Sequence, residues 1–235
     1  MKSLYLSLFF SLFLGASKAQ KLQTFTDPRD NHTYKIVTIG NQTWMAENLA
    51  YLPRVSSPAA GTDEEALSKP FYYVAGYHGE DTSTAKKSEN YKKYGVLYNY
   101  VAAKASCPPG WHLPSDEEWK ALERHLGMPA AQANETMFRN EGMVGYKLKG
   151  VTGWPTKGSN QFGFAALPGG FRYGINPGVG NKGGFGYVGA EAFFWTSTVY
   201  REGIVYRRQL TSESKGIVRF PQMVSHGYSV RCIKD

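Results

Sequence analysis

Cys107-Pro108-Pro109-Gly110-Trp111-His112-Leu113-Pro114-Ser115-Asp116-Glu117-Glu118-Trp119 joins one of the two cysteines of the chain to its strongest helix start. Ser115 followed by Glu118 is the pattern of a capping box, in which the two residues satisfy free N–H groups of the first turn. The spacing of Trp119, Leu122 and Leu126 predicts one buried helical face. Gly127 is then expected to end this helix.

Residues 1–19 have the pattern of a secretory signal peptide. Met1-Lys2 is a charged start, residues 4–14 are apolar, and Ala19 ends a segment with small residues suited to cleavage. The apolar run is shorter than the roughly 20 residues that a membrane span needs, so we expect no membrane insertion after cleavage. Residues 20–235 are then expected to form one exported domain with a single core. A buried apolar N-terminal segment is the alternative interpretation.

The mature chain is expected to be mildly basic. Lys and Arg number 27 and Asp and Glu number 19, so that loss of Lys2 and Lys18 leaves 25 − 19 = +6. The basic residues are scattered or occur in doublets, and no tract is typical of a protein that follows a nucleic-acid backbone. We therefore expect a solvated basic surface and no nucleic-acid partner.

Aromatic residues and glycines are abundant and helical patterns are few, which predicts short strands and many turns. A hairpin is expected over residues 33–45, and a weaker second helix over residues 130–139. Residues 53–93 are expected to be a long surface loop, an insertion in the domain, with a possible short strand at 71–74. Further strands are expected in the last part of the chain, over residues 193–198, 204–210 and 227–233.

The two cysteines, Cys107 and Cys232, are expected to form one disulfide, because the chain has an export signal. In the last strand Tyr228, Val230 and Cys232 share one face and Arg231 points to the other, so Cys232 is placed on the side expected to be buried. The bond would contribute about 4–5 kcal/mol by the chain-entropy argument. The alternative is two separated free thiols. No His pair stands at zinc-ligand spacing beside them, so we expect no metal and no cofactor.

The glycine- and aromatic-rich stretch over residues 160–187 is the best candidate for a ligand-binding surface. Aromatic rings offer flat faces to sugars or peptides, asparagines offer donors and acceptors, and glycines allow the backbone to approach a ligand. The alternative is that the rings fill the core and the glycines make turns. The candidate ligand-binding residues are Asn160, Tyr173, Asn176, Asn181, Phe185 and Tyr187.

Catalytic patterns are absent or weak in the sequence. Residues 178–183 fit G-x-G-x-x-G but lack the strand before and the helix after that a dinucleotide site needs. His112 is expected to be a structural hydrogen-bonding histidine rather than a general base. Asp116, Glu117 and Glu118 are expected to serve the helix dipole rather than a glycosidase site. Esterase and zinc-protease motifs do not occur, so we expect no enzymatic activity.

Seven blocks of sequence, taken in order, resemble the Fibrobacter succinogenes major paralogous domain, and the likeness extends over residues 24–235. The blocks are residues 34–40, 42–49, 94–100, 107–119, 166–172, 194–198 and 227–232. The resemblance implies an α+β fold of the C-type-lectin-like kind, related to the formylglycine-generating-enzyme fold, with short irregular antiparallel strands, one or two helices and long loops. It also implies a Gram-negative bacterium of the Bacteroidota or Fibrobacter kind, and no established activity.

The chain departs from the pattern at two points. Members often have two more cysteines before the block at residues 94–100, and this chain has none there, so the 53–93 loop is not tied by a disulfide. The calcium-binding triplets of C-type lectins are also missing, and a Ca²⁺ site needs such carboxylates. Both cysteines are committed to one bond, so oxidase chemistry of the formylglycine-generating type is not expected.

These observations lead to three hypotheses about function. We expect an exported, non-enzymatic binding module of the cell envelope, in the periplasm, on the outer-membrane surface or outside the cell, that recognises a glycan or protein through its Gly/aromatic loops. The alternative is a structural or assembly subunit of a larger surface complex. A hydrolase with an unrecognised site is the third hypothesis.

Overall fold

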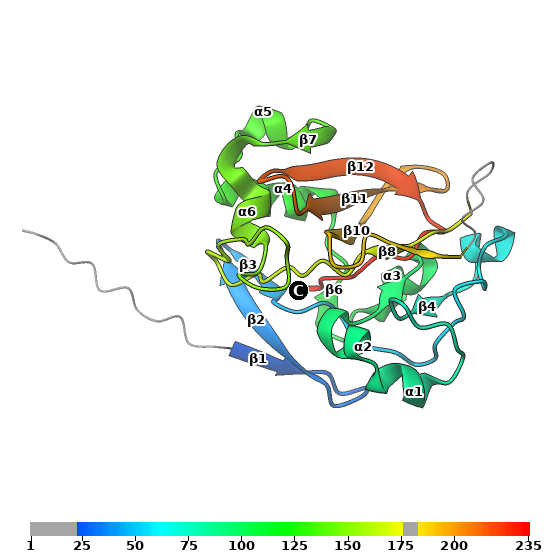
Figure 1. The fold of residues 1–235 in the computed structure, drawn as a ribbon. Helices are drawn as coiled ribbons and strands as arrows, with labels where there is room; N and C mark the ends of the chain where they lie inside the picture. Colours follow the sequence, from blue (N-terminus) through cyan, green and yellow to red (C-terminus); the bar gives the residue numbers. More distant parts are fainter. Residues whose placement is uncertain (1–22, 176–182) are drawn as a thin grey trace, which may run out of the picture.

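The computed structural model describes residues 23–175 and 183–235, which form the mixed α+β fold that the sequence predicts (Figure 1). The strands are β1 (Gln23–Thr26), β2 (Thr33–Ile39), β3 (Gln42–Met45), β4 (Tyr72–Tyr73), β5 (Leu97–Tyr98), β6 (Trp111–His112), β7 (Met137–Arg139), β8 (Phe171–Arg172), β9 (Phe185–Gly186), β10 (Glu191–Arg201), β11 (Ile204–Thr211), β12 (Ile217–Met223) and β13 (Ile233–Lys234). The helices are η1 (Glu64–Leu67), α1 (Thr82–Lys87), α2 (Glu89–Tyr94), α3 (Tyr100–Ser106), α4 (Asp116–His125), α5 (Ala130–Ala133), η2 (Glu141–Met143) and α6 (Val144–Leu148). These helices outnumber the one or two that the resemblance implied, and most are only one or two turns long.

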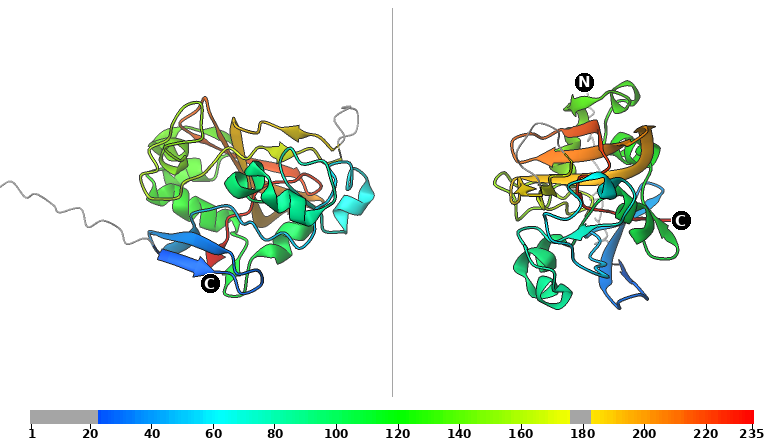
Figure 2. Two further views of the ribbon diagram at one scale, coloured as in Figure 1. Left: turned by 60° about the horizontal axis from the view of Figure 1, so that its bottom comes forward. Right: turned by 90° about the vertical axis from the view of Figure 1, so that its right-hand side faces the viewer.

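Two antiparallel sheets hold most of the strand residues. One has the order β1-β2-β3-β13-β6 and the other the order β10-β11-β12-β7, and two small hairpin-like pairs, β4-β5 and β8-β9, complete the described strands. Strands β10 to β12 lie on one side of the molecule and β1 and β2 on the other, with the C-terminal segment passing between them (Figures 1 and 2). The predicted hairpin at residues 33–45 is confirmed as β2 and β3, joined at Gly40, whose φ of +60° suits glycine.

Helix α4 confirms the helix predicted from the capping box. The Ser115 side chain accepts a hydrogen bond from the Glu118 N–H, and the Glu118 carboxylate accepts one from the Ser115 N–H at 2.7 Å. Trp119, Leu122 and Leu126 are all buried in one core cluster, as their spacing predicted. His112 hydrogen-bonds the same Glu118 at 2.8 Å and therefore has the structural role expected of it.

The second helix predicted over residues 130–139 is wrong beyond its first turn. The helix ends at Ala133, and residues 137–139 form strand β7, which pairs with β12. Arg139 explains the change, because its guanidinium donates to the buried Glu123 carboxylate and to the Ala133 carbonyl. A tertiary ion pair thus outweighs a weak helical pattern. Strand β12 was not expected at all, since Pro221 interrupts its pattern.

Residues 53–93 contain more regular structure than the long surface loop that we expected. The possible strand at 71–74 is present as β4, but helices α1 and α2 follow, capped by the side chains of Asp81 and Ser88. Asn99 anchors the segment: its amide group donates to the Lys69 carbonyl at 2.8 Å and accepts from the Phe71 N–H at 2.9 Å. The segment is therefore packed on the domain without a disulfide of its own.

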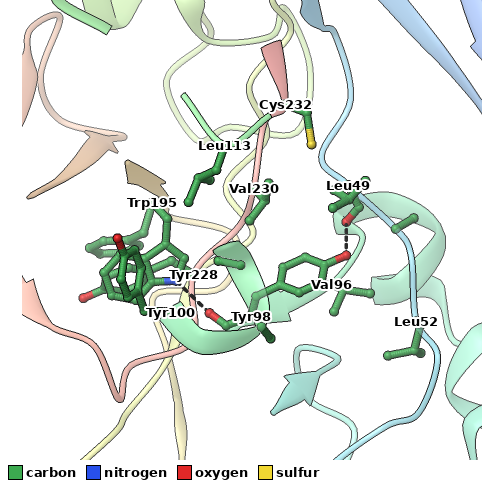
Figure 3. Packing of buried hydrophobic residues seen from close by; sticks show 14 of the residues in the cluster. Leu49, Leu52, Val96, Tyr98, Tyr100, Leu113, Trp195, Tyr228, Val230 and Cys232 are labelled. Atoms are coloured by element: carbon green, nitrogen blue, oxygen red, sulfur yellow. Dashed lines mark hydrogen bonds between the residues drawn. The ribbon is translucent and has the colours of Figure 1, made fainter. Parts of the chain in front are cut away.

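The core is divided into two main clusters that meet along the C-terminal segment. Tyr228, Val230 and Cys232 belong to one cluster, whereas Ile233 belongs to the other. Figure 3 shows the first cluster, in which Tyr98 accepts a hydrogen bond from Trp195 at its carbonyl (2.7 Å) and donates its hydroxyl to a backbone carbonyl. The predicted disulfide is present between Cys107 and Cys232.

The three carboxylates of residues 116–118 all lie in the first turn of α4, where the helix dipole was expected to favour them, but Asp116 also has a further role. Asp116 is buried and binds Arg208 at 2.7 Å and Arg219 at 2.8 Å. Glu123, which lies further along the same helix, binds Arg208 and Arg139, both at 2.6 Å. We call these five residues the buried ion cluster; it connects α4 to β7, β11 and β12.

Candidate functional site

A groove of about 840 Å³ opens beside strand β2. Its walls are β2 with the chain that follows β3, the helix α2 with the glycine that ends it, and the loop that follows α6 over residues 150–167. In Figure 1 these segments are β2 in blue, α2 in teal and the yellow-green loop near β3. We call this cavity the groove, and it is a concave candidate site lined by several polar side chains.

Arg231 lies beneath the groove and is 1% exposed. Its Nε donates to the Asn48 side chain at 2.8 Å, and its Nη atoms donate to the carbonyls of Met45, Phe164 and Ala165. Burial lowers the pKa of this guanidinium to about 9. Within the described residues it forms no direct ion pair; its hydrogen bonds go to carbonyl and amide groups, and the charge of Glu47 also acts on it.

Asn48 connects the groove's walls. Its amide nitrogen donates to the Tyr94 carbonyl at 2.9 Å, while its oxygen accepts from Arg231. The chain can come this close because α2 ends at Gly95, which has a φ of +70°. A Cβ at Gly95 would stand 2.7 Å from the Leu49 carbonyl oxygen, so only glycine fits.

The rim of the groove is rich in lysine. Lys35 lies 3.6 Å from Glu47, and Lys92 pairs with Glu89 at 2.7 Å. Lys93 forms no ion pair with a described residue; its Nζ lies 4.9 Å from the centre of the Tyr94 ring. The residues that line the groove therefore include three lysines and Arg231, whereas the lining carboxylate is Glu47.

The structure separates the residues that sequence reasoning grouped as one site. Asn160 lines the groove, where its side-chain oxygen accepts the Ala165 N–H at 2.7 Å. Phe185 packs instead against His78, with ring centres 5.8 Å apart, at the third core cluster. Asn176 and Asn181 lie outside the described residues.

Tyr173 and Tyr187 meet at a different place, around the buried ring of Phe171. The ring centres lie 4.5 Å and 6.0 Å from that of Phe171, and Tyr187 is 54% exposed. Other aromatic residues of this stretch, including Phe164, belong to the core. Some rings of the stretch therefore fill the core, as the alternative interpretation expected, whereas Tyr187 reaches the surface, where ligand binding stays a prediction.

Arg207 extends across the inner side of this aromatic group. Its guanidinium lies over the rings of Phe193 at 5.1 Å and Tyr228 at 5.8 Å, and its Nη1 donates to Gln209 at 2.6 Å. The Nε atom is buried and has no hydrogen-bond partner among the described residues. Burial lowers the pKa of the Arg207 guanidinium too. Its positive charge in turn lowers the pKa of His226.

The pH dependence of stability is expected to report on His226. Burial, together with the charges of Arg207 and Arg172, lowers the pKa of His226 to about 4. Between pH 6.5 and this value the unfolded chain binds a proton that the folded chain does not, so stability falls as the pH falls, by up to about 3 kcal/mol. Urea unfolding of wild type and His226→Gln between pH 7 and pH 4 checks this. If the free energy of unfolding fell equally with pH in wild type and in His226→Gln, the prediction would be contradicted.

Sequence patterns do not reveal the groove, because its walls come from segments far apart in the chain. One signal was available: Arg231 stands between Val230 and Cys232 in an otherwise apolar strand. A charge in such a position is buried unless the strand is exposed on that face, and buried charges need partners. The partners, Asn48 and three carbonyls, could not be found from spacing.

The sequence model of the Fibrobacter succinogenes major domain matches residues 37–234. The chain belongs to this family. The matched range contains most of the groove walls, Arg231 and both cysteines, and it begins within β2. No curated protein and no solved structure was found to match the chain.

Two further properties of the family domain concern metals and membranes. In residues 23–175 and 183–235, no group of three or more His, Cys, Asp or Glu side chains is arranged to hold a metal ion. Over the same residues, no helix has the length and apolar character needed to cross a membrane.

Proposed function

We propose that the chain is an exported, non-enzymatic module of the bacterial cell envelope that binds a glycan in the groove. The observation that carries this proposal is the groove itself: an open cavity of about 840 Å³ with polar side chains on three walls. Asparagine, threonine, lysine and glutamate side chains provide both donors and acceptors for sugar hydroxyls, and the half-buried Tyr91 provides ring surface. Asn160 brings one residue of the predicted Gly/aromatic surface into this site.

We also propose that the fold is of the C-type-lectin-like kind and that residues 1–19 are a cleaved signal peptide. The short antiparallel strands, the long loops and a disulfide from the middle of the chain to its last strands support the first statement. The disulfide supports export, because such bonds persist in oxidising compartments. The periplasm, the outer-membrane surface and the extracellular space of a Gram-negative host of the Bacteroidota kind all meet this condition.

Filling the groove is expected to abolish glycan binding. Thr152 is exposed on the groove wall, and Thr156 is exposed on the same loop outside it. Thr152→Trp is therefore expected to weaken binding of the best ligand from a glycan array by at least about ten-fold, whereas Thr156→Trp leaves it unchanged. Mass spectrometry of the recovered ligand is expected to show intact sugar. Equal effects of the two variants would contradict the site, and cleaved sugar would contradict the non-enzymatic role.

A structural or assembly subunit is the second candidate function, and the surface around β7 favours it. Met137 and Phe138 on this edge strand are 54% and 55% exposed, and Met143 nearby is also exposed. Exposed apolar side chains on an open sheet edge are typical of protein contacts. Loss of co-purifying envelope proteins from Phe138→Ser, with full retention by Thr152→Trp, would favour this candidate over glycan binding.

A further inference from the structure

We infer that the groove selects an acidic oligosaccharide, one whose carboxylate groups face Lys93 and the buried Arg231. This inference rests on the proposed glycan-binding function and adds to it the chemical class of the ligand. It depends on the charges around the groove and on how each is, or is not, already neutralised within the protein.

The first step is the balance of charge along the groove. The cations that line it are Lys35, Lys92, Lys93 and Arg231, whereas the lining carboxylate is Glu47. Low-dielectric walls concentrate the field of such an excess, which raises the local concentration of anions. In the buried ion cluster, by contrast, Arg139, Arg208 and Arg219 each bind a carboxylate.

The second step is that Glu47 is already occupied by the protein. One carboxylate oxygen accepts the Lys35 N–H at 2.8 Å, and the other lies 3.6 Å from the Lys35 ammonium. Lys92 is likewise paired with Glu89. Lys93 therefore remains as a cation with no carboxylate partner among the described residues, and Arg231, on which the charge of Glu47 acts, forms no direct ion pair with them.

The third step is the position of these two cations. Lys93 extends from α2 toward the facing loop, so that its Cε would lie 3.8 Å from a Cβ placed at Gly153. Arg231 lies beneath the floor, and four donor contacts to Asn48 and three carbonyls fix its orientation. A ligand in the groove would thus meet a mobile charge at the rim and a fixed charge below. Burial makes the fixed charge more effective, since water screens it less.

An acidic sugar fits these walls better than an acidic peptide does. The groove offers side-chain hydroxyl, amide and ammonium groups together with the half-buried ring of Tyr91, which suit the hydroxyls and flat faces of sugar rings. A peptide would instead be expected to add to a sheet edge. Strand β2, which borders the groove, pairs with β1 over residues 33–36 and with β3 over residues 36–39.

The experiment compares three probes by isothermal titration calorimetry at low and high salt: a galacturonate hexamer, a neutral galactose hexamer and a hexaglutamate peptide. The uronate is expected to bind most tightly and to weaken with salt. Lys93→Gln is expected to weaken uronate binding by about five-fold, the change that an exposed charge pair at the upper end of its usual range provides. Glu47→Gln is expected to strengthen it, because it removes a repelling carboxylate and frees Lys35.

Lys87→Gln is the matched control, since Lys87 is an exposed lysine at the end of α1 outside the groove. It is expected to bind the uronate as wild type does, and melting curves verify that all three variants are folded. Equal, salt-independent binding of uronate and neutral hexamer in the groove would overturn the acidic preference while leaving the proposed glycan function intact. Tighter binding of hexaglutamate would overturn the choice of a sugar. Absence of all sugar binding would contradict both.

Discussion

Glu123→Gln is expected to lower the free energy of unfolding by about 3–5 kcal/mol, the usual loss when one partner is removed from a buried ion pair. Glu123 is fully buried, and its two oxygens receive three hydrogen bonds, from Arg139 at 2.6 Å and 2.9 Å and from Arg208 at 2.6 Å. Glutamine keeps the shape but leaves the Arg139 guanidinium without its charge partner and removes one of the two carboxylates that bind Arg208. Chemical denaturation with the disulfide intact measures the change.

Glu117→Gln provides the control for this prediction. Glu117 is on the same helix but 72% exposed, and it pairs with Lys120 at the surface. Its replacement is expected to change stability by less than about 1 kcal/mol, as for most surface ion pairs. If Glu123→Gln and Glu117→Gln unfolded at the same denaturant concentration, the buried ion cluster would not have the role assigned to it.

The same cluster determines how the protein responds to strong acid. Burial acts to raise the pKa of Asp116, but hydrogen bonds and charges from Arg219 and Arg208 outweigh it and hold the pKa well below its usual value. A carboxylate with a depressed pKa stabilises the fold above its unfolded pKa of about 3.9, and this stability is lost as the pH falls further. The stability that the buried ion cluster contributes therefore begins to fall near pH 4, where the stability that neutral His226 contributes has already been lost.

Removal of the disulfide by the double variant Cys107→Ser, Cys232→Ser is expected to cost about 4–5 kcal/mol, because the unfolded chain then loses its longest restraint. The two cysteines are separated by 125 positions in sequence, and a long loop is the case in which a cross-link restricts the unfolded state most. The measurement is the denaturation midpoint of wild type with and without a reductant, compared with that of the variant.

Reductant is expected to bring the wild type close to the variant and to leave the variant unchanged. This comparison separates loss of the cross-link from any packing defect that serine causes at Cys232, which is fully buried. A loss of less than about 1 kcal/mol on reduction would show that strain or residual structure cancels the restraint. Export of the variant from its host is expected to fall accordingly, since a reduced margin of stability lowers abundance.

The parts of the fold that the sequence predicts are those specified by local chemistry. The capping box at Ser115 and the turn at Gly40 depend on residues close together in the chain, and both are confirmed. Tyr228, Val230 and Cys232 are buried in one core cluster, but the strand predicted over residues 227–233 is wrong for most of its length, because only Ile233–Lys234 forms a strand and residues 227–229 form isolated bridges. Strand β12 could not be predicted, because Pro221 disrupts its pattern and only pairing with β7 and β11 defines it. Helices α1 and α2 are too short to show a periodic apolar face.

The candidate site likewise combines residues that local chemistry points to with residues that only tertiary contacts bring together. Asn160 was identified because asparagine among glycines is typical of a functional loop, and it lines the groove. The remaining walls depend on Asn48 and Gly95 bringing α2 against the chain that follows β3, a contact between distant segments. Arg231 could be recognised as an anomaly in an apolar strand, but its hydrogen-bond partners become apparent only in three dimensions.

The position of β13 has a consequence for biosynthesis. This strand follows every other described strand in the chain, yet it pairs with both β3 and β6 in the middle of the five-stranded sheet. A polypeptide that emerges N-terminus first therefore cannot join β3 to β6, or form the bond between Cys107 and Cys232, until this final stretch has emerged. Under the proposed export, we expect the incomplete sheet to expose an apolar seam to chaperones and oxidoreductases during that interval.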